Sequence, residues 1–305
     1  MKTDPILALD NLVKDFAGKR AVDQISLKLS RGEIMGLLGP NGAGKTTTIR
    51  MIMNIIAPDS GRVEIFGQQF SEAHKNRIGY LPEERGLYRK LKVSETLQFF
   101  GKLKGMDAKN IESRGLELLK EFSLEDYYHK KVEELSKGMA QKLQFITTII
   151  HSPELLILDE PFTGLDPINI ELVKDIILRK KREGITIIFS THLMEYAEKI
   201  VDSLVMINQG KKVIDGRLPD IKSSFGSRFI KVRYEGNPDF IGNLKFVKAW
   251  RNFGKEMEIE LSNINKKGEL LRMLAAKLAI ESFQVASPSL NNIFMHHVGE
   301  KKTGA

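Results

Sequence analysis

Short apolar runs alternate with segments of helical spacing through the first two thirds of the chain. The opening 34 residues alternate polar and apolar side chains, as in ISLKL at 25–29, which predicts antiparallel strands with one buried face. Unbroken apolar runs at 34–38, 155–158 and 185–189 predict buried strands of a parallel sheet that is covered on both faces. Further strands are predicted at 62–66 and 78–81, and segments with helical spacing lie at 46–56, 93–122, 139–150 and 168–183. Ser94 or Asp107 is the expected N-cap within the segment 93–122. Together the patterns predict a layered α/β core.

The pattern changes near residue 218, close to Pro219 and a pair of serines at 223–224. Beyond this point, short amphipathic segments replace the long buried runs. Strands are predicted at 229–234, 245–250 and 257–261, and helices at 269–278 and 291–297. We therefore predict a large domain over residues 1–218 and a small α+β domain over residues 219–305.

Composition supports a folded protein rather than a disordered or membrane-spanning one. Of the 305 residues, 42% are hydrophobic and 28% are charged, which is ordinary for a folded domain. No apolar run approaches the ~20 residues needed to cross a bilayer, and no secretory signal is expected at the N-terminus. The absence of cysteine excludes disulfides and zinc–thiolate sites, and it fits a reducing compartment.

The net charge of +8 is concentrated in the last part of the chain. Residues 219–305 hold 14 Lys and Arg against 9 Asp and Glu, or +5, which leaves 33 against 30, or +3, for the rest. A solvated basic face and contact with anionic lipid headgroups beside a membrane partner both remain open. No nucleic-acid partner is expected, because the basic residues are scattered and no nucleic-acid-binding motif accompanies them.

The sequence GPNGAGKT at 39–46 matches the phosphate-loop pattern, in which glycines let backbone N–H groups surround phosphate oxygens. Lys45 would reach the β- and γ-phosphates of ATP, and the Thr46 hydroxyl would bind Mg²⁺. The predicted strand before the loop and the predicted helix after it provide the context that this motif requires. The candidate nucleotide-binding residues of the loop are Asn41, Gly42, Ala43, Gly44, Lys45, Thr46 and Thr47.

Two acidic residues, Asp159 and Glu160, directly follow the apolar run at 155–158. A buried strand would place them at its carboxyl end, where open α/β sheets bind their ligands. Asp159 would then hold Mg²⁺ through water, and Glu160 would orient and deprotonate an attacking water. These two motifs predict a nucleotide site without identifying the kind of protein that carries it.

Three further motifs occur in a fixed order around the acidic strand: LSKGM at 135–139, GLD at 164–166 and STH at 190–192. With the phosphate loop, this series resembles the ABC ATPase family across residues 1 to about 218. The resemblance implies a P-loop NTPase cassette with a mixed or parallel core sheet, an N-terminal antiparallel sheet and a helical subdomain at about 84–152.

The resemblance also implies a head-to-tail dimer with two ATP molecules at its interface. Ser136 and the Gly138 backbone, at the start of a helix, would contact the γ-phosphate bound to the partner chain. His192 would contact the γ-phosphate and hold the catalytic geometry. Phe16, 29 residues before Lys45 (45 − 16), stands where the family places an aromatic ring against adenine.

The sequence departs from the common family pattern in two places. The signature motif has Lys137 and Met139 where glycine and glutamine are usual, and Glu83 stands where most members have the glutamine of the Q-loop. Glu83 thereby becomes a third candidate metal ligand, beside Thr46 and Asp159. Both departures resemble the export-type branch akin to the sodium-exporting ATPase subunits, as does the SPSLNNIF segment at 287–294.

The function implied is an ATP-binding and ATP-hydrolysing transporter subunit that drives export through an integral-membrane permease. It would act as a homodimer or beside a related cassette, in the cytoplasm, peripheral on the inner face of the membrane. The apolar run at 87–100, which adjoins basic residues, would dock the permease. The alternatives are a soluble ABC ATPase acting on ribosomes or DNA and a nucleotide-dependent regulator, although 83–135 is too short for a coiled coil and no sensor motif is recognised. No motif indicates the transported substrate.

Overall fold

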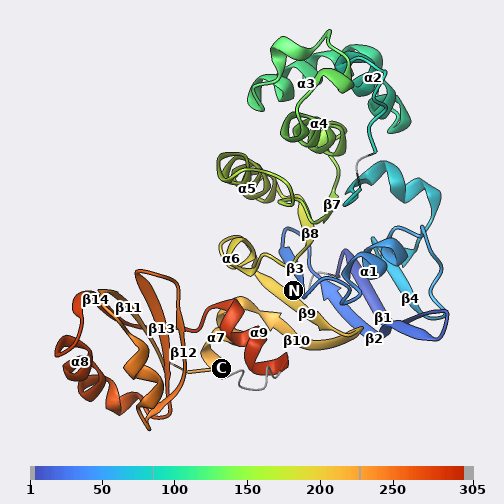
Figure 1. The fold of residues 1–305 in the computed structure, drawn as a ribbon. Coiled ribbons are helices and arrows are strands. Elements are labelled where there is room, and N and C mark those ends of the chain that lie inside the picture. The colour runs from blue at the N-terminus through green and yellow to red at the C-terminus, as the bar shows by residue number, and fades with distance from the viewer. Residues whose placement is uncertain (1–3, 85, 227, 299–305) are drawn as a thin grey trace. The chain divides into compact units, whose positions relative to one another are not determined.

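The computed structural model describes residues 4–84, 86–226 and 228–298. Contacts divide the chain into two compact units, Met1–Gly216 and Arg217–Ala305. The division falls close to the change of pattern near residue 218. The two units are described separately below (Figure 1).

A six-stranded sheet forms the centre of the first unit, in the order β10-β9-β3-β8-β7-β6. The strands β9, β3, β8, β7 and β6 pair in parallel, and β10 lies at the edge. Every residue of β3, β7 and β8 is buried, as their unbroken apolar runs predict. The strands are β3 (Ile34–Leu38), β6 (Ile78–Leu81), β7 (Leu155–Asp159), β8 (Thr186–Thr191), β9 (Ser203–Asn208) and β10 (Lys211–Arg217).

A second, antiparallel sheet is built from the N-terminal strands, in the order β2-β1-β4-β5. Its inward side chains share one apolar cluster with the core sheet and with Ile49 and Ile52 of helix α1. The helix predicted to reach residue 56 ends at Ile52, because Asn54 adopts a left-handed φ of 52°. The elements are β1 (Leu7–Phe16), β2 (Lys19–Leu29), α1 (Lys45–Ile52), β4 (Ser60–Ile65) and β5 (Gln68–Gln69).

Three helices form the predicted helical subdomain, at the top of Figure 1: α2 (Val93–Leu103), α3 (Ala108–Glu121) and α4 (Lys137–Ile149). The single helical stretch predicted at 93–122 is therefore two helices, separated by a turn at Gly105 with φ 76°. Asp107 caps α3 by accepting from the Asn110 N–H at 3.0 Å, as one of the two predicted caps. Ser94 is not a cap, because α2 begins one residue earlier, after Lys92.

The first unit is completed by α5 (Pro167–Arg182) and the short α6 (Met194–Ala197). Asp166 caps α5 by accepting from the Asn169 N–H at 3.0 Å. The fold class predicted from the sequence is confirmed: the unit has the mixed core sheet, the antiparallel N-terminal sheet and the helical subdomain of a P-loop cassette.

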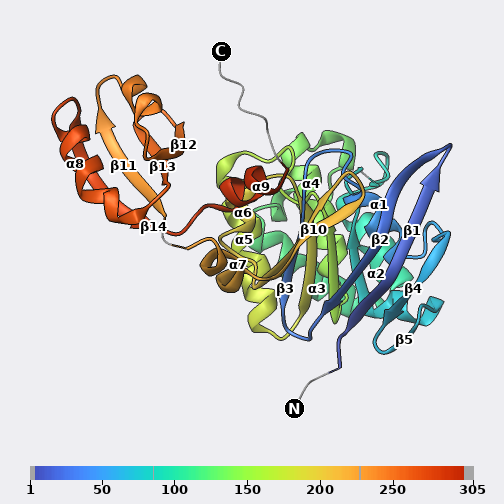
Figure 2. The same ribbon diagram turned by 90° about the horizontal axis from the view of Figure 1, so that it is seen from below.

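The second unit is a four-stranded antiparallel sheet with a helix on one face, as the predicted α+β composition requires (Figure 2). Its strand order is β12-β13-β11-β14, and Leu270 and Leu274 of α8 pack into the apolar cluster of the sheet. Glu258 is buried in this unit and accepts from Ser289, at 3.2 Å, and from Asn292 at the start of α9. The elements are α7 (Leu218–Ser224), β11 (Phe229–Glu235), β12 (Val247–Asn252), β13 (Glu256–Leu261), α8 (Lys267–Ala275), β14 (Ala279–Ala286) and α9 (Leu290–Val298).

Four strands lie where no strand is predicted: β5, β9, β10 and β14. In β14 the helical spacing of the preceding segment runs on to residue 278, which hides the strand that begins at Ala279. Short 3₁₀ helices occur at Glu72–Arg77, Glu125–Tyr127, Val132–Glu134, Asp239–Asn243 and Ile264–Lys266.

Gly79 of β6 allows the core sheet to approach helix α4 closely. A Cβ at this position would lie 2.4 Å from the Thr148 carbonyl oxygen and 2.9 Å from Leu156 Cδ1. We therefore expect Gly79→Ala to destabilise the protein by about 1–3 kcal/mol through overpacking. Gly86→Ala is the matched control, because a Cβ there meets no atom within 4 Å. Thermal unfolding of both variants tests this, and equal midpoints would contradict it.

Candidate functional site

The loop between β3 and α1 is held in a conformation that only glycine adopts readily. Gly39, Gly42 and Gly44 have φ values of 153°, 75° and 107°. A Cβ on Gly39 would lie 2.1 Å from the Ile207 carbonyl oxygen, and one on Gly44 would lie 2.4 Å from the Ala21 carbonyl oxygen. The glycines therefore serve both the turn and its close packing against neighbouring backbone.

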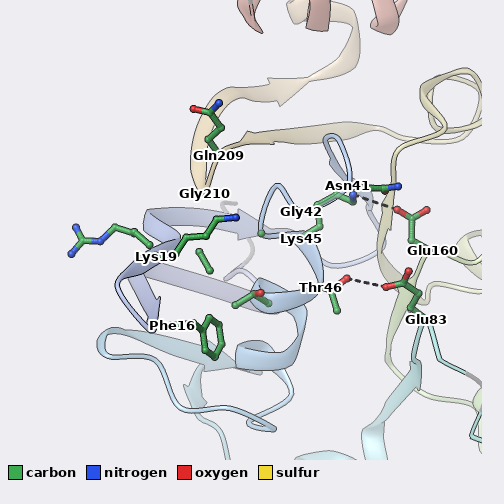
Figure 3. A pocket seen from close by; sticks show the side chains of 14 residues that line it. Phe16, Lys19, Asn41, Gly42, Lys45, Thr46, Glu83, Glu160, Gln209 and Gly210 are labelled. Atoms are coloured by element: carbon green, nitrogen blue, oxygen red, sulfur yellow. Dashed lines mark hydrogen bonds and ion pairs between the residues drawn. The ribbon is translucent and has the colours of Figure 1, made fainter.

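A cavity of about 630 Å³ opens over this loop (Figure 3). Sequence-predicted residues from four separate segments line it: Phe16, the phosphate loop with its following helix, Glu83 after β6, and Glu160 after β7. Phe16 is 47% exposed, so its ring is available to a flat ligand, and Lys14 Nζ lies 5.5 Å from the ring centre. The predicted residues that line the cavity are Phe16, Asn41, Gly42, Gly44, Lys45, Thr46, Thr47, Glu83 and Glu160.

Lys45 is buried at the floor of the cavity, with 5% of its surface exposed. Its ammonium donates to the carbonyl oxygens of Gly39, at 2.9 Å, and Pro40, at 3.2 Å. It also lies 3.3 Å from Glu160 Oε1, an ion pair drawn in Figure 3. The loop therefore aims a fixed positive charge into the cavity, as phosphate binding requires.

Glu160 carries the second charge of the site. Its backbone takes a left-handed φ of 50°, and its N–H donates to Ser190 Oγ at 3.0 Å. Both carboxylate oxygens lie 3.1 Å from His192 Nδ1. Because an ionised carboxylate only accepts hydrogen bonds, we assign the ring proton to Nδ1. The structure thus brings together the three predicted catalytic residues Glu160, His192 and Lys45.

Asp159 provides a test of whether the site fits Mg²⁺. Its Oδ1 accepts from Thr46 Oγ1, at 3.2 Å, and from Ser190 Oγ, whereas its buried Oδ2 has no partner among the described residues. Burial raises the pKa of Asp159, and the nearby charges of Glu83 and Glu160 raise it further, against hydrogen bonds from Ser190 and Thr46. A cation would give Oδ2 a partner and would lower the pKa of Asp159, so the residues present fit Mg²⁺.

Glu83 approaches the same point from another segment. Its Oε2 lies 3.5 Å from Thr46 Oγ1, the hydroxyl that also bonds Asp159 (Figure 3). Thr46, Glu83 and Asp159 are therefore the residues that would hold Mg²⁺. No cluster of three or more His, Cys, Asp or Glu side chains suited to a metal occurs in the described ranges, so water and phosphate oxygens would complete the ligand set.

The other predicted residues lie away from this cavity. Ser136 caps α4, accepting from the Met139 N–H at 3.3 Å, and lines a separate cavity of about 370 Å³. Gly138 lies in the first turn of the same helix. Ala43 belongs to the loop, but its side chain is buried and does not line the cavity.

Five cavity residues were not predicted: Lys19, Arg20, Ala21, Gln209 and Gly210. Gly210 lies in the turn between β9 and β10, where its N–H donates to the Ala43 carbonyl oxygen at 2.9 Å. The NQG sequence at 208–210 is typical of a turn. Nothing in the local sequence, however, places that turn beside the phosphate loop, because β9 itself was not predicted.

The site combines a glycine-rich loop, a buried lysine and a pair of acids at the carboxyl edge of a parallel sheet. This combination defines a P-loop nucleotide-hydrolysing protein. The chain matches the family described as ABC transporter over residues 22–163 and the family described as ATP-binding protein DrrA1-3-like, C-terminal domain, over residues 216–298.

Whole-length relatives agree with these matches. The ABC transporter ATP-binding protein YhaQ of Bacillus subtilis is 40% identical over 294 residues, which cover 96% of this chain and 99% of that protein. The linearmycin resistance ATP-binding protein LnrL of the same organism is 33% identical over 307 residues, covering 96% and 98%. A solved structure of the ATP-binding subunit of an ABC transporter has a TM-score of 0.68 at 32% identity, covering 72% of this chain and 93% of its own.

The chain therefore belongs to the ABC transporter ATP-binding family, in the export-type branch with a DrrA-like C-terminal domain. It binds ATP and hydrolyses it to power transport. None of the helices in the described part of the chain has the length and apolar character needed to span a bilayer.

We expect Glu83→Gln to raise the Mg²⁺ concentration required for half-maximal ATP hydrolysis severalfold, because a carboxylate binds this hard cation more strongly than an amide oxygen. Glu84→Gln is the control, since its side chain is 86% exposed and approaches Arg50 rather than Thr46. Titration of Mg²⁺ at fixed ATP measures the effect. Identical titrations for Glu83→Gln and the parent would mean that Glu83 faces solvent.

Proposed function

We propose that the chain is the motor subunit of an exporter, in which two cassettes close over ATP and act on a membrane permease. The observation that carries the proposal is the separation of two half-sites. Lys45 and Glu160 line one cavity, whereas the signature residue Ser136 lines another, and the two cavities share no residue. A second cassette that brought its Ser136 over the first cavity would complete the site. Export is supported by the DrrA-like domain and by the resistance role in the name of LnrL.

The side chains of the first half-site divide the work of hydrolysis. Lys45 would bind the β- and γ-phosphates, while Phe16 would contact adenine. Glu160 would orient the attacking water and accept its proton, and His192 would hold the Glu160 carboxylate through Nδ1. Mg²⁺, held by Thr46, Asp159 and Glu83, would neutralise charge on the transferring phosphoryl group. Ser136 and the backbone of Gly138 would serve the ATP bound to the partner chain.

An apolar groove supports the permease as partner. A cavity of about 270 Å³ in the first unit is lined by apolar side chains from α2, from the loop after β6 and from the end of α1. Leu103 is 60% exposed at this groove, and Lys75 and Lys104 add positive charge to the lining. An apolar surface with basic neighbours suits a short amphipathic cytoplasmic helix with acidic residues. Its apolar lining includes Met53, Pro82, Leu87, Phe100 and Leu103.

Only part of the apolar run at 87–100, the predicted docking site, lines this groove. Leu87 and Phe100 line it, whereas Val93 and Leu97 are buried in the subdomain. Tyr88, 54% exposed, lies outside the groove lining and packs edge-on against Phe99, with ring centres 5.2 Å apart. Through such docking the chain would be cytoplasmic and peripheral on the inner face of the membrane.

Glu160→Gln should retain ATP binding but slow hydrolysis by roughly 10²–10⁴-fold, the usual range for a general base. The amide also removes one negative charge beside the bound phosphates, so ATP should trap the closed dimer. Gel filtration with and without ATP detects the dimer. Lys45→Ala serves as a control that should bind no nucleotide. A Glu160→Gln variant that stays monomeric with ATP and retains full turnover would contradict the assignment.

Leu103→Ser should weaken permease association about 10–100-fold, because burying one leucine at an interface contributes roughly 1.5–3 kcal/mol. Affinity purification from detergent-solubilised membranes, with identification of the multi-span partner, measures it. Leu116→Ser is the matched control: Leu116 is 40% exposed on α3 but does not line the groove. ATP affinity should stay unchanged in both variants. Equal recovery of the partner by both would show that the permease docks elsewhere.

A further inference from the structure

Gln144, in the middle of α4, lies between two cavities. It lines both the 370 Å³ cavity beside Ser136 and the 270 Å³ apolar groove, as does Leu87. The side chain is an amide in a buried position, with 6% of the residue exposed. A buried amide requires hydrogen-bond partners, and where this one finds its partner determines what it holds in place.

The partner of Gln144 is the backbone next to a candidate metal ligand. Gln144 Nε2 donates to the Glu84 carbonyl oxygen at 3.2 Å. Glu84 directly follows Glu83, whose Oε2 lies 3.5 Å from Thr46 Oγ1. The hydrogen bond thus restrains the backbone carbonyl of the residue that follows Glu83, and it does so from a helix whose start carries the LSKGM motif.

Glu84 is also held by a second contact, which is much weaker. Arg50 Nη2 lies 3.5 Å from Glu84 Oε1, but the Glu84 side chain is 86% exposed and that of Arg50 is 43% exposed. A solvated ion pair of this kind contributes little to the position of a loop. The partly buried hydrogen bond from the Gln144 amide is therefore the stronger restraint on Glu84 among the described contacts.

Both partners of this hydrogen bond, the Gln144 side chain and the loop that contains Glu84, lie at the apolar groove. Pro82 and Gly86 flank the Glu83–Glu84 segment in the chain, and both line the groove together with Gln144. A helix seated in the groove would contact the loop and the amide that holds it. Displacing either would change the position of Glu83 relative to Thr46.

We propose that Gln144 is a positioning residue that couples occupancy of the apolar groove to the placement of Glu83 at the Mg²⁺–ATP site. The inference rests on the proposed function, since it takes Glu83 as a metal contact and a permease helix as the occupant of the groove. Gln144 itself does not line the cavity that contains Lys45, Thr46 and Glu83.

The first test compares Gln144→Met with Thr147→Val. Both remove a buried polar group from α4, but the Thr147 hydroxyl donates within the helix, to the Gln144 carbonyl oxygen at 2.7 Å. Gln144→Met should raise the Mg²⁺ concentration needed for half-maximal binding of a fluorescent ATP analogue about two- to tenfold, the range for one net hydrogen bond. It should also speed amide hydrogen exchange at Leu81, Glu83 and Glu84. Thr147→Val should do neither.

The double variant Glu83→Gln with Gln144→Met separates the inference from its premise. If Gln144 acts through Glu83, the two substitutions together should shift the Mg²⁺ requirement no further than Glu83→Gln alone. Additive shifts, or a Gln144→Met variant that matches Thr147→Val in both readouts, would overturn the inference. A silent Glu83→Gln would instead refute the metal role of Glu83 in the proposed function, and hydrogen exchange alone would then decide whether Gln144 holds the loop.

The complex with the membrane partner provides the final comparison. Gln144→Met should recover as much permease as the parent chain, yet lose the permease-dependent change in turnover. Leu103→Ser should lose the permease itself. Loss of the partner by Gln144→Met to the same extent as Leu103→Ser would show that Gln144 is only a docking contact, and the inference would fall.

Discussion

The parallel register of three buried strands is the constraint on which the site depends. β3 pairs with β8 so that Leu38 lies opposite Thr191, and β8 pairs with β7 so that Ser190 lies opposite Asp159. Because parallel strands end at the same edge, this register brings the phosphate loop, the acids and His192 to one place. A slip of one strand by one residue would turn every side chain of that strand to the opposite face, including those at the carboxyl edge.

The Ser190 side chain connects the two acids at this edge of the sheet. Its hydroxyl donates to Asp159 Oδ1 and accepts from the Glu160 N–H at 3.0 Å. One small side chain therefore fixes both acids, whose carboxylates then point to different partners: Asp159 to Thr46, and Glu160 to Lys45 and His192. Buried charges are tolerated only with such partners, and the separation of the two carboxylates suits Asp159 to the proposed ligand role and Glu160 to the proposed role of base.

The sequence predicted those parts of the fold whose signal is local. Unbroken apolar runs located β3 and β7, and Asp107 marked a helix start through its short side chain. Ser136 and His192 were predicted only because the LSKGM and STH motifs resemble those of a known family. No physical pattern in the sequence alone indicates their roles. The turn at Gly210 could not be placed, because its role comes from a backbone hydrogen bond to Ala43, far away in the chain. Likewise, Gln144 has no motif: only the structure shows that its amide reaches the Glu84 carbonyl.

Helix α4 joins these elements into one mechanical unit. Its N-terminus carries Ser136, and at roughly 1.5 Å per residue its 13 residues extend about 20 Å from there along the subdomain. Gln141 Nε2 donates to the Thr163 carbonyl oxygen at 2.8 Å, just beyond Glu160, while Gln144 Nε2 donates to the carbonyl oxygen of Glu84, the residue after Glu83. A stiff helix tied by adjacent turns to both acidic segments cannot shift without disturbing each of them. In the proposed function, closure over ATP at one end of α4 and a partner in the groove beside its middle would therefore act on the same rigid body. That is the physical condition for coupling hydrolysis to movement of a permease.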